Sequence, residues 1–324
     1  MARRKARKIP PTEYSIYATL AEGSTICDIG QVMSQINRKK FRQGMQYAIQ
    51  SIEIYAPSTD VIVSRLPHHW VMVNSWTKAM ELWRQQQNDT AAEAGLLDTI
   101  AAHRDFKVYG DATHADGDYN VLQPITVGTG AVSDNYRTLS QGQSISATVG
   151  MDWEHSEIVI PNKTTVGNTV EYKLHVLGDD STGGSGASVG IIHAYANSRA
   201  RPQQVDPNFV DVATGGVYGE MFDVGDDNNQ ITTNFQNKND FLPYLNDVDS
   251  EFEFYPGGAN QGSGWTIEDV LSIQSGNRTL SSSTVGPFLA NCGLLLFAVS
   301  NGTCQVKITL APGDYKGVAD GHGS

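Results

Sequence analysis

Short runs of apolar residues, several of them alternating with polar ones, recur along this chain between turn-forming loops. The runs are rich in β-branched and aromatic side chains and are bounded by Gly, Asn, Asp and Ser, a pattern typical of β-strands. We expect strands at QYAIQSIEIY, DVIVSRL, HWVMVNS, FKVYG, SEIVIP, TVEYKLHVLG, SVGIIHAYA, GLLLFAVS and TCQVKITL. A set of about eight such strands predicts a sandwich or a barrel.

The last two runs, in GLLLFAVSNGTCQVKITL, alternate most clearly. Asn301 and Gly302 separate them, and this dipeptide is typical of a two-residue hairpin turn. Such a hairpin would pair apolar residues on one face: Val299 with Cys304, Phe297 with Val306, and Leu295 with Ile308. We therefore expect one wholly apolar face on this pair of strands.

One segment has a helical period instead. Trp76, Ala79, Met80 and Trp83 recur at helical spacing, and a second helical stretch is expected at residues 90–102. The pattern predicts a helical insertion at about residues 76–104. No cofactor motif accompanies the tryptophans, so we interpret this apolar stripe as packed core.

The longest polar stretches are interpreted as surface loops: GDATHADGDYN, GDDSTGGSGAS, NSRARPQQVDPN and GDDNNQITTNFQNKND. The chain shows no repeat of fixed period and no Pro/Ser-rich linker between two folding units. We therefore predict a flexible basic arm over residues 1–13 and a single domain over residues 14–324.

Charge is distributed unevenly along the 324 residues. The formal net charge is −12, yet the first 42 residues hold nine lysines and arginines against three acidic residues. The cations of this segment are Arg3, Arg4, Lys5, Arg7, Lys8, Arg38, Lys39, Lys40 and Arg42. A polyanion such as a nucleic acid would meet this segment while the acidic remainder keeps the protein soluble. A solubilising tail or a nuclear-import signal explains the same composition.

Composition also narrows the compartment. No apolar run is long enough for a membrane span, and the N-terminal residues lack the apolar core of a signal peptide. Cys27, Cys292 and Cys304 form neither a disulfide framework nor a metal-binding pair. We expect a soluble protein in a reducing compartment.

Motifs for catalysis are weak. GASVG, residues 186–190, matches G-x-S-x-G with Ser188 at the nucleophile position. A nucleophile elbow needs a strand before the serine and a helix after it, whereas a Gly/Ser loop precedes Ser188 and IIHAYA looks like a strand. We interpret Ser188 as part of a loop that enters a strand, and the same loop lacks the ending of a phosphate-binding P-loop.

Acidic loops offer oxygen ligands without a metal-binding spacing. The candidates are Asp111, Asp116 and Asp118 with His114, and Asp247, Asp249 and Glu251. Neither group follows the EF-hand pattern or supplies the ligands that zinc prefers. His68 and His69 have no partner at helical spacing and are interpreted as polar residues at a strand edge. We expect no metal centre, no cofactor and no enzymatic activity.

Four segments carry a resemblance to a known family: MARRKARK, INRKKFRQGMQYAIQSIEIY, LPHHWVMVNSWTKAMELWRQQ and VKITLAPGDYKGVAD. Together with the overall organisation they resemble the capsid proteins of circular Rep-encoding single-stranded DNA viruses, especially environmental and marine relatives. The resemblance covers about half of the chain.

The resemblance implies an all-β fold, a single eight-stranded jelly-roll β-sandwich with the helical insertion and long surface loops. It implies a homo-oligomeric, icosahedral shell of about 60 copies that encloses a single-stranded genome. The basic residues of the arm and of the NRKKFR run would contact that genome, in the virion and during assembly in the host nucleus. In a jelly roll the last two strands lie in opposite sheets, so SNGT would form a corner between sheets and not a hairpin turn; both strands would still point their apolar faces at one core.

Two other functions fit the same residues. One is a monomeric β-sandwich binding module of the carbohydrate-binding type, with the basic tail incidental to its function. The other is a serine hydrolase that uses Ser188. Particle size separates the shell from the module, and fluorophosphonate labelling of Ser188 identifies the hydrolase.

Overall fold

The computed structural model describes residues 12–96, 104–124, 152–162, 168–181, 187–199, 264–274 and 281–321. In these residues the chain is mostly β and forms several sheets, with more helix than we expected. Residues 1–11 of the basic arm, with its five cations, and the acidic loop with Asp247, Asp249 and Glu251 lie outside the described residues.

Two five-stranded sheets form the larger part of the structure, which we call the β body. The first sheet has the order β1 (Ser15–Leu20), β14 (Cys304–Leu310), β3 (Tyr47–Ala56) and β11 (Ser281–Val285), and β12 (Phe288–Ala290) also pairs with β3. The second has the order β10 (Thr266–Gln274), β4 (Ser58–Arg65), β13 (Leu294–Val299), β2 (Gly23–Asp28) and β6 (Asn120–Val121). All of these pairs are antiparallel except β2 with β6. A short hairpin of β15 (Pro312–Gly313) and β16 (Gly317–Val318) follows.

One apolar core lies between the two sheets. Alternate residues of each strand face it, including Ile52 and Ile54 from β3, Val63 from β4 and Phe297 from β13. Alternation of period two gives each strand one apolar face, and two such faces pack together to exclude water. The buried stripe of helix α1 (Ile29–Asn37) extends this core.

The hairpin expected at Asn301-Gly302 is wrong. Strand β13 lies between β4 and β2 in one sheet, while β14 lies between β1 and β3 in the other. A type I′ hairpin turn needs positive φ at both central residues, and here Gly302 has it but Asn301 does not. The expected apolar faces are present: Leu295, Phe297, Val299, Cys304, Val306 and Ile308 are all buried. SNGT therefore forms a corner between the two sheets.

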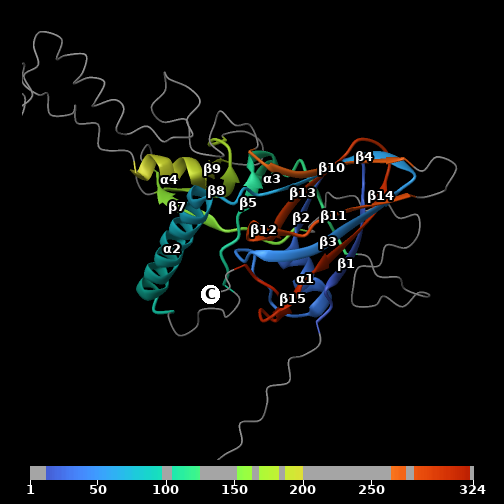
Figure 1. The fold of residues 1–324 in the computed structure, drawn as a ribbon. Helices are drawn as coiled ribbons and strands as arrows, with labels where there is room; N and C mark the ends of the chain where they lie inside the picture. The colour runs from blue at the N-terminus through green and yellow to red at the C-terminus, as the bar shows by residue number, and fades with distance from the viewer. Residues whose placement is uncertain are drawn as a thin grey trace, which may run out of the picture.

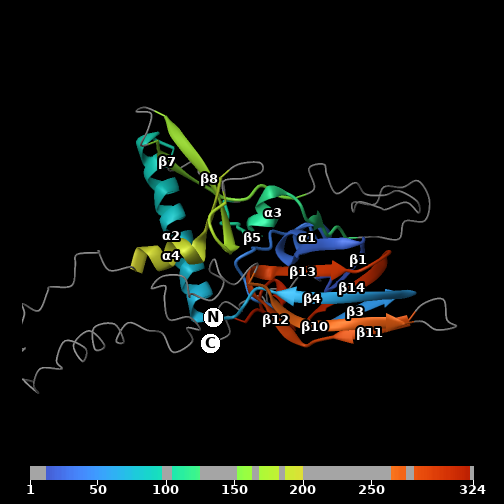
Figure 2. The ribbon, with the colours of Figure 1, turned by 90° about the horizontal axis from the view of Figure 1, so that it is seen from above.

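A long insertion, residues 66–265, separates β4 from its neighbour β10. It contains a third sheet, in which β8 (Thr169–Leu177) pairs with β5 (Tyr109–Asp111), β7 (Glu157–Pro161) and β9 (Ser188–Gly190). Its helices are α2 (Trp70–Glu93), α3 (Ala112–Asp116) and α4 (Ile191–Arg199). Figure 1 shows α2, α4, β7 and β8 on one side of the molecule and the β body on the other, and Figure 2 shows the same division from above.

The insertion has its own apolar core. As expected, the stripe on α2 is packed: Trp83 is buried, and Trp76 and Met80 are partly buried against the same cluster. The helix begins earlier than predicted, at Trp70, so the strand expected at HWVMVNS is wrong. The strand expected at SVGIIHAYA is also largely wrong, because β9 ends at Gly190 and α4 begins at Ile191. The second helical stretch, expected at residues 90–102, is described only to residue 96; within it α2 continues to Glu93.

Two of the contacts that join the insertion to the β body lie just after α1. The Gln43 side chain donates to the Asp28 carboxylate (2.7 Å) and to the Val108 carbonyl (2.9 Å), and it accepts from the Val108 amide (2.6 Å). Trp76 lies against Gly44, where a Cβ atom would come within 2.0 Å of the indole. A short polar bridge and a close ring contact therefore fix the insertion at the end of α1.

The three cysteines are buried and free. In the part of the chain that the structure describes, no helix has the length and apolar character needed to span a bilayer.

Candidate nucleic-acid interface

Helix α1 positions the four described cations that the sequence singled out. Asp28 caps its first turn by accepting a hydrogen bond from the Gln31 amide (3.1 Å). One face of the helix is buried in the core through Ile29, Val32, Met33 and Ile36. The helix ends at Arg38, whose φ of 53° is left-handed and turns the chain into residues 38–42, which we call the basic loop.

The basic loop is held by an apolar residue in its middle. Phe41 is fully buried, and the Ser34 hydroxyl accepts a hydrogen bond from the Phe41 amide (2.8 Å) while donating to the Gly30 carbonyl (2.7 Å). Anchoring Phe41 leaves its charged neighbours at the surface. Arg38 and Arg42 are exposed, and Lys39 and Lys40 are half-buried.

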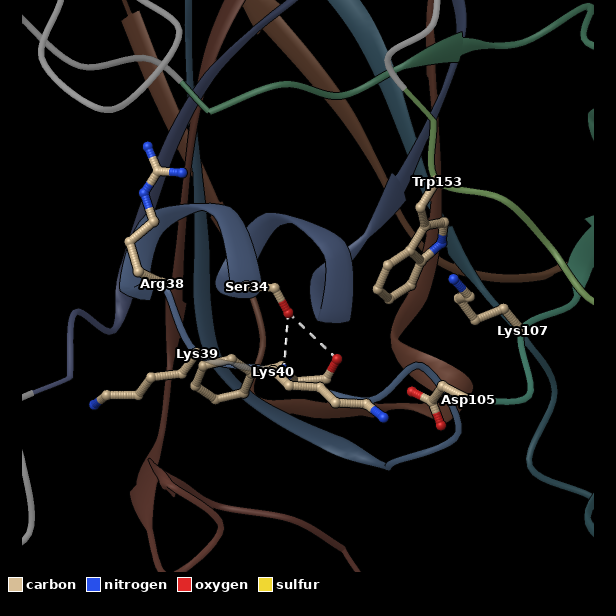
Figure 3. Close-up of a pocket in the computed structure, with 8 residues that line it drawn as sticks. Ser34, Arg38, Lys39, Lys40, Asp105, Lys107 and Trp153 are labelled. Atoms are coloured by element: carbon tan, nitrogen blue, oxygen red, sulfur yellow. Dashed lines mark hydrogen bonds between the residues drawn. The ribbon is translucent and has the colours of Figure 1, made fainter. Parts of the chain in front are cut away.

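A surface pocket of about 330 Å³ lies between this loop and the insertion. The insertion contributes Asp105 and Lys107, which precede β5, and Trp153, which precedes β7. Figure 3 shows the complete lining: Ser34, Arg38, Lys39, Lys40, Phe41, Asp105, Lys107 and Trp153. Four cations and one carboxylate therefore face this pocket.

The electrostatics of the pocket favour an added negative charge. Burial lowers the pKa of Lys107, and its ammonium lies 4.6 Å from the centre of the Trp153 ring. Burial raises the pKa of Asp105, and the nearby Lys40, Arg42 and Lys107 oppose that shift. Of these cations, Arg42 makes an ion pair with Asp105, and this pair is a long one, with 3.9 Å between Arg42 Nε and Asp105 Oδ1. Among the described residues that line the pocket, one carboxylate does not neutralise the four cations, and Asp28 and Glu154 act on Lys107 from outside the lining. An anion would relieve the mutual repulsion of the cations.

Another lysine from the C-terminal part of the chain joins the group. The Lys316 ammonium lies over the Phe41 and Tyr315 rings, 5.6 and 5.3 Å from their centres. Burial, with Arg42 and Lys40 nearby, lowers the pKa of Lys316. The basic surface thus combines residues from three distant parts of the sequence.

Thr12, the first described residue, lies beside this surface. The Thr12 hydroxyl donates to the Lys316 carbonyl (2.7 Å) and accepts from the Lys39 ammonium (3.1 Å). Arg3, Arg4, Lys5, Arg7 and Lys8 lie outside the described residues. Thr12, which follows them in the sequence, is therefore held between the basic loop and Lys316.

Sequence reasoning missed Lys107, Trp153 and Lys316. Gln43 bonds to Val108, the neighbour of Lys107, across a separation of 65 residues, and no local periodicity links residues so far apart. Trp153 lies in a segment without helical or strand pattern, and Lys107 lies in the run FKVYG, for which we expected a strand; neither signal identifies a partner.

The acidic residue of DATHADGD with the most contacts is structural. Asp111 caps α3 by accepting from the His114 amide (2.8 Å). Its second oxygen accepts from the Tyr119 hydroxyl (2.8 Å) and from the Trp265 indole (2.7 Å). Both carboxylate oxygens are thus occupied by protein donors, which leaves Asp111 a poor metal ligand.

A different group, His114, Asp152 and His155, has ligand atoms within 4.8 Å of one another. The Gly110 amide donates to His114 Nδ1 (3.0 Å), and a backbone amide can only donate. Neutral His114 must therefore carry its proton on Nε2, which faces Asp152 Oδ2 at 3.3 Å. Coordination through Nε2 would require this nitrogen to lose that proton, so the hydrogen bonds oppose a metal at His114.

His155 completes an aromatic cluster in the same place. Its ring stacks on Tyr109 with centres 3.8 Å apart, and burial lowers the pKa of His155 to about 3. A neutral ring packed on a tyrosine is consistent with a structural role.

Ser188 does not lie on a nucleophile elbow. It is the first residue of β9, its side chain is 1% exposed, and its hydroxyl has no hydrogen-bond partner among the described residues. A helix follows the strand, contrary to expectation, but it begins at Ile191 and not directly after the serine. His68 and His69 precede α2 and not a strand, with His69 at the N-cap.

No known protein family, curated protein or solved structure matches this chain.

Proposed function

We propose that this chain is a viral capsid protein with a jelly-roll fold, related to those of circular Rep-encoding single-stranded DNA viruses. Copies assemble into a closed icosahedral shell around a single-stranded DNA genome. The basic arm and the basic loop contact the genome from the inner side of the shell.

The order of the strands supports the jelly roll. One sheet reads β1-β14-β3-β11 and the other β10-β4-β13-β2. Each successive pair has one member in each sheet: β1 and β2, β3 and β4, β10 and β11, β13 and β14. The chain thus crosses between two four-stranded sheets at every step except from β4 to β10, which are neighbours in one sheet. This connectivity supports a jelly roll, an architecture common in viral capsids. In this reading β6 and β12 are additions to the eight strands.

The observation that carries the nucleic-acid contact is the group of cations formed by the basic loop and Lys316. Thr12 is hydrogen-bonded to Lys39 of the basic loop and to the Lys316 carbonyl, and the five cations of the arm precede it in the sequence. An arm that continues from this point would add its charge to the same positive surface, whereas the chain as a whole is acidic. Such a surface attracts phosphates without reading the sequence of bases.

Particle size tests the assembly. Purified full-length protein should give regular particles in negative-stain electron microscopy and a megadalton peak in light scattering. A peak at the monomer mass of 35.1 kDa under all assembly conditions would instead support the binding module. Covalent labelling of Ser188 by a fluorophosphonate would support the hydrolase.

Deletion of residues 2–8 tests the arm. We expect the truncated chain to fold and to form shells that contain little or no nucleic acid. If all five arm cations contact phosphates, the log–log salt slope of single-strand binding should flatten by about 3.5, from roughly 0.7 per phosphate. A matched control is Lys78→Gln on α2, which removes a half-buried cation elsewhere. If the truncated chain forms equally filled shells, the basic loop and not the arm contacts the genome.

A further inference from the structure

The pocket beside the basic loop combines two features that a general anion site does not need together. Trp153 offers an indole ring in its wall, and Lys40 and Lys107 lie near it with Arg38 and Lys39 beyond. Proteins that bind single-stranded nucleic acids use such pairs, an aromatic ring for the base and cations for the backbone. A duplex does not present an unstacked base to a ring in a pocket.

Lys107 is placed to bind a phosphate. Among the described residues its ammonium contacts the Trp153 ring at 4.6 Å but has no hydrogen-bond acceptor. Its three N–H donors therefore remain available for phosphate oxygens. A phosphate on Lys107 would lie next to the indole, within reach of the base of the same nucleotide.

The size of the pocket sets the length of the ligand. At about 330 Å³ it lies at the lower end of the range for small-ligand pockets, roughly 300–1,000 Å³. This volume suits a single nucleotide. Figure 3 shows Lys40, Lys107, Asp105 and Trp153 on one side of the pocket, with Arg38 and Lys39 directed to the other side.

We propose that this pocket holds one nucleotide of a single strand, with its base on Trp153 and its phosphate on Lys40 and Lys107. Arg38 and Lys39 then contact the neighbouring phosphates of the strand, in the direction of Thr12. The inference rests on the proposed function for its choice of ligand. It adds a site to which both the β body and the insertion contribute, and a base contact that the arm alone does not supply.

Removing the charge of Asp105 tests whether nucleotide binding becomes stronger or weaker. Its side chain is 15% exposed and lies among the cations that would hold the phosphate. A negative charge there repels the ligand, so Asp105→Asn should tighten nucleotide binding. If Asp105 served only to hold the lysines in place, the same substitution would weaken binding.

The experiment measures binding of deoxyadenosine 5′-monophosphate to the full-length chain by calorimetry and by tryptophan fluorescence. Deoxyribose 5-phosphate and deoxyadenosine serve as half-ligands that lack the base or the phosphate. The nucleotide should bind at least about fivefold more tightly than deoxyribose 5-phosphate, from the usual contribution of base stacking. Equal affinity for these two ligands would overturn the proposal.

Substitutions locate the site. Trp153→Leu should weaken nucleotide binding about fivefold or more, and Lys107→Met about tenfold or more. Trp153→Phe keeps an aromatic face and should retain most of the affinity, which separates lost stacking from lost folding. The matched controls, Trp70→Leu and Lys78→Met, lie on α2 outside the pocket and should leave affinity unchanged. Unchanged affinity in Lys107→Met and Trp153→Leu, with no gain in Asp105→Asn, would place the nucleotide elsewhere.

The two proposals fail separately. A chain that forms filled shells but binds the nucleotide equally well in all pocket variants retains the capsid function and loses the pocket. A chain that stays monomeric but shows the expected changes in affinity retains the pocket and loses the capsid function.

Discussion

The β body and the insertion are built in different ways. In the body, each sheet needs strands from both ends of the chain, since β14 lies between β1 and β3 and β13 lies between β2 and β4. The insertion leaves after β4 and returns at β10, and these two strands are antiparallel neighbours with Arg65 opposite Thr266. The 200 residues between them thus leave and return at one edge of a sheet. Apart from the short edge strand β6, every strand of the body lies outside the insertion, whereas the insertion depends on the body for its anchor.

The cores reflect this difference. The core of the body is made almost wholly from the body's own residues, with Leu122 as the addition from the insertion. The core of the insertion also uses Cys292 and Leu294 of the body. The pocket, in contrast, needs both regions, because its cations come mainly from the basic loop and its aromatic wall comes from the insertion. We infer that the body determines the fold and that the insertion modifies the surface.

The largest expected effect is in the core of the body. Phe297 is fully buried on β13, the middle strand of its sheet. Phe297→Ala should lower the free energy of unfolding by about 3–5 kcal/mol, from lost apolar burial and the cavity left behind. Hydrogen exchange should show lost protection in both regions. The matched control, Val270→Ala on the exposed side of β10 (58% exposed), should change stability by less than about 0.5 kcal/mol.

A core substitution in the insertion should have a more local effect. Trp83 is 9% exposed and lies 5.6 Å from Phe106, centre to centre. Trp83→Ala should cost about 3 kcal/mol and remove exchange protection from α2 and β8 while β3 and β13 stay protected. The neighbouring Leu82→Ala, at a 53% exposed position, is the control. Equal loss of protection in both regions would show that they unfold as one unit.

The joint between the regions should be of intermediate sensitivity. A Cβ atom on Gly44 would lie 2.0 Å from the Trp76 ring, so Gly44→Ala must displace the indole. We expect a loss of about 1–3 kcal/mol from this overpacking, measured by chemical denaturation. Combining it with Trp76→Leu should recover part of that loss in a double-mutant cycle; strictly additive effects would contradict the contact.

The smallest expected effect is the change in the free energy of unfolding per pH unit when Asp28, at the same joint, titrates. Burial raises its pKa to about 7, Asp152 adds to the shift, and hydrogen bonds from Gln43 and Gln31 oppose it. The folded state therefore binds more protons than the unfolded state between about pH 4 and pH 7. Stability should fall as pH rises through this window, by at most about 1.4 kcal/mol per pH unit.

Urea denaturation between pH 5 and pH 8 measures this slope. Asp28→Asn cannot ionise and should flatten it, even where the substitution lowers stability at every pH. A wild-type stability that rises over this range, with the same rise in Asp28→Asn, would mean that other groups dominate the titration.

Much of the β body followed from local pattern, and its omissions have physical causes. Strands β3, β4, β13 and β14 were predicted because their apolar residues are β-branched or aromatic and closely spaced. Strand β10, TIEDVLSIQ, was missed because an edge strand keeps one side in solvent and carries Glu268 and Asp269 in its middle. Helix α1 was missed although its buried residues recur at helical spacing after the capping Asp28. That signal was present in the sequence.

Two apolar runs were assigned the wrong structure. WVMV and IIHAYA are short and apolar, and periodicity alone does not separate a buried strand from one turn of a buried helix in such runs. Their packing decides: α2 and α4 lie against each other and cover the apolar side of the third sheet through Val71, Met72, Ile191 and Ile192. Packing against segments that are distant in sequence thus determines that these two runs are helical.

The sequence by itself determined which residues turn inward and where the cations are concentrated, because burial preference and charge belong to each side chain. Only the tertiary structure decided the partners. Asn301-Gly302 permits a hairpin, but both hydrogen-bonding edges of β13 and of β14 are taken by other strands, so the same two residues form a corner. Likewise Lys40, Lys107, Trp153 and Lys316 come together only because α1, the insertion and the C-terminal segment pack at one place. Local pattern carries no information about such long-range pairing, since any strand with one apolar face can cover any other.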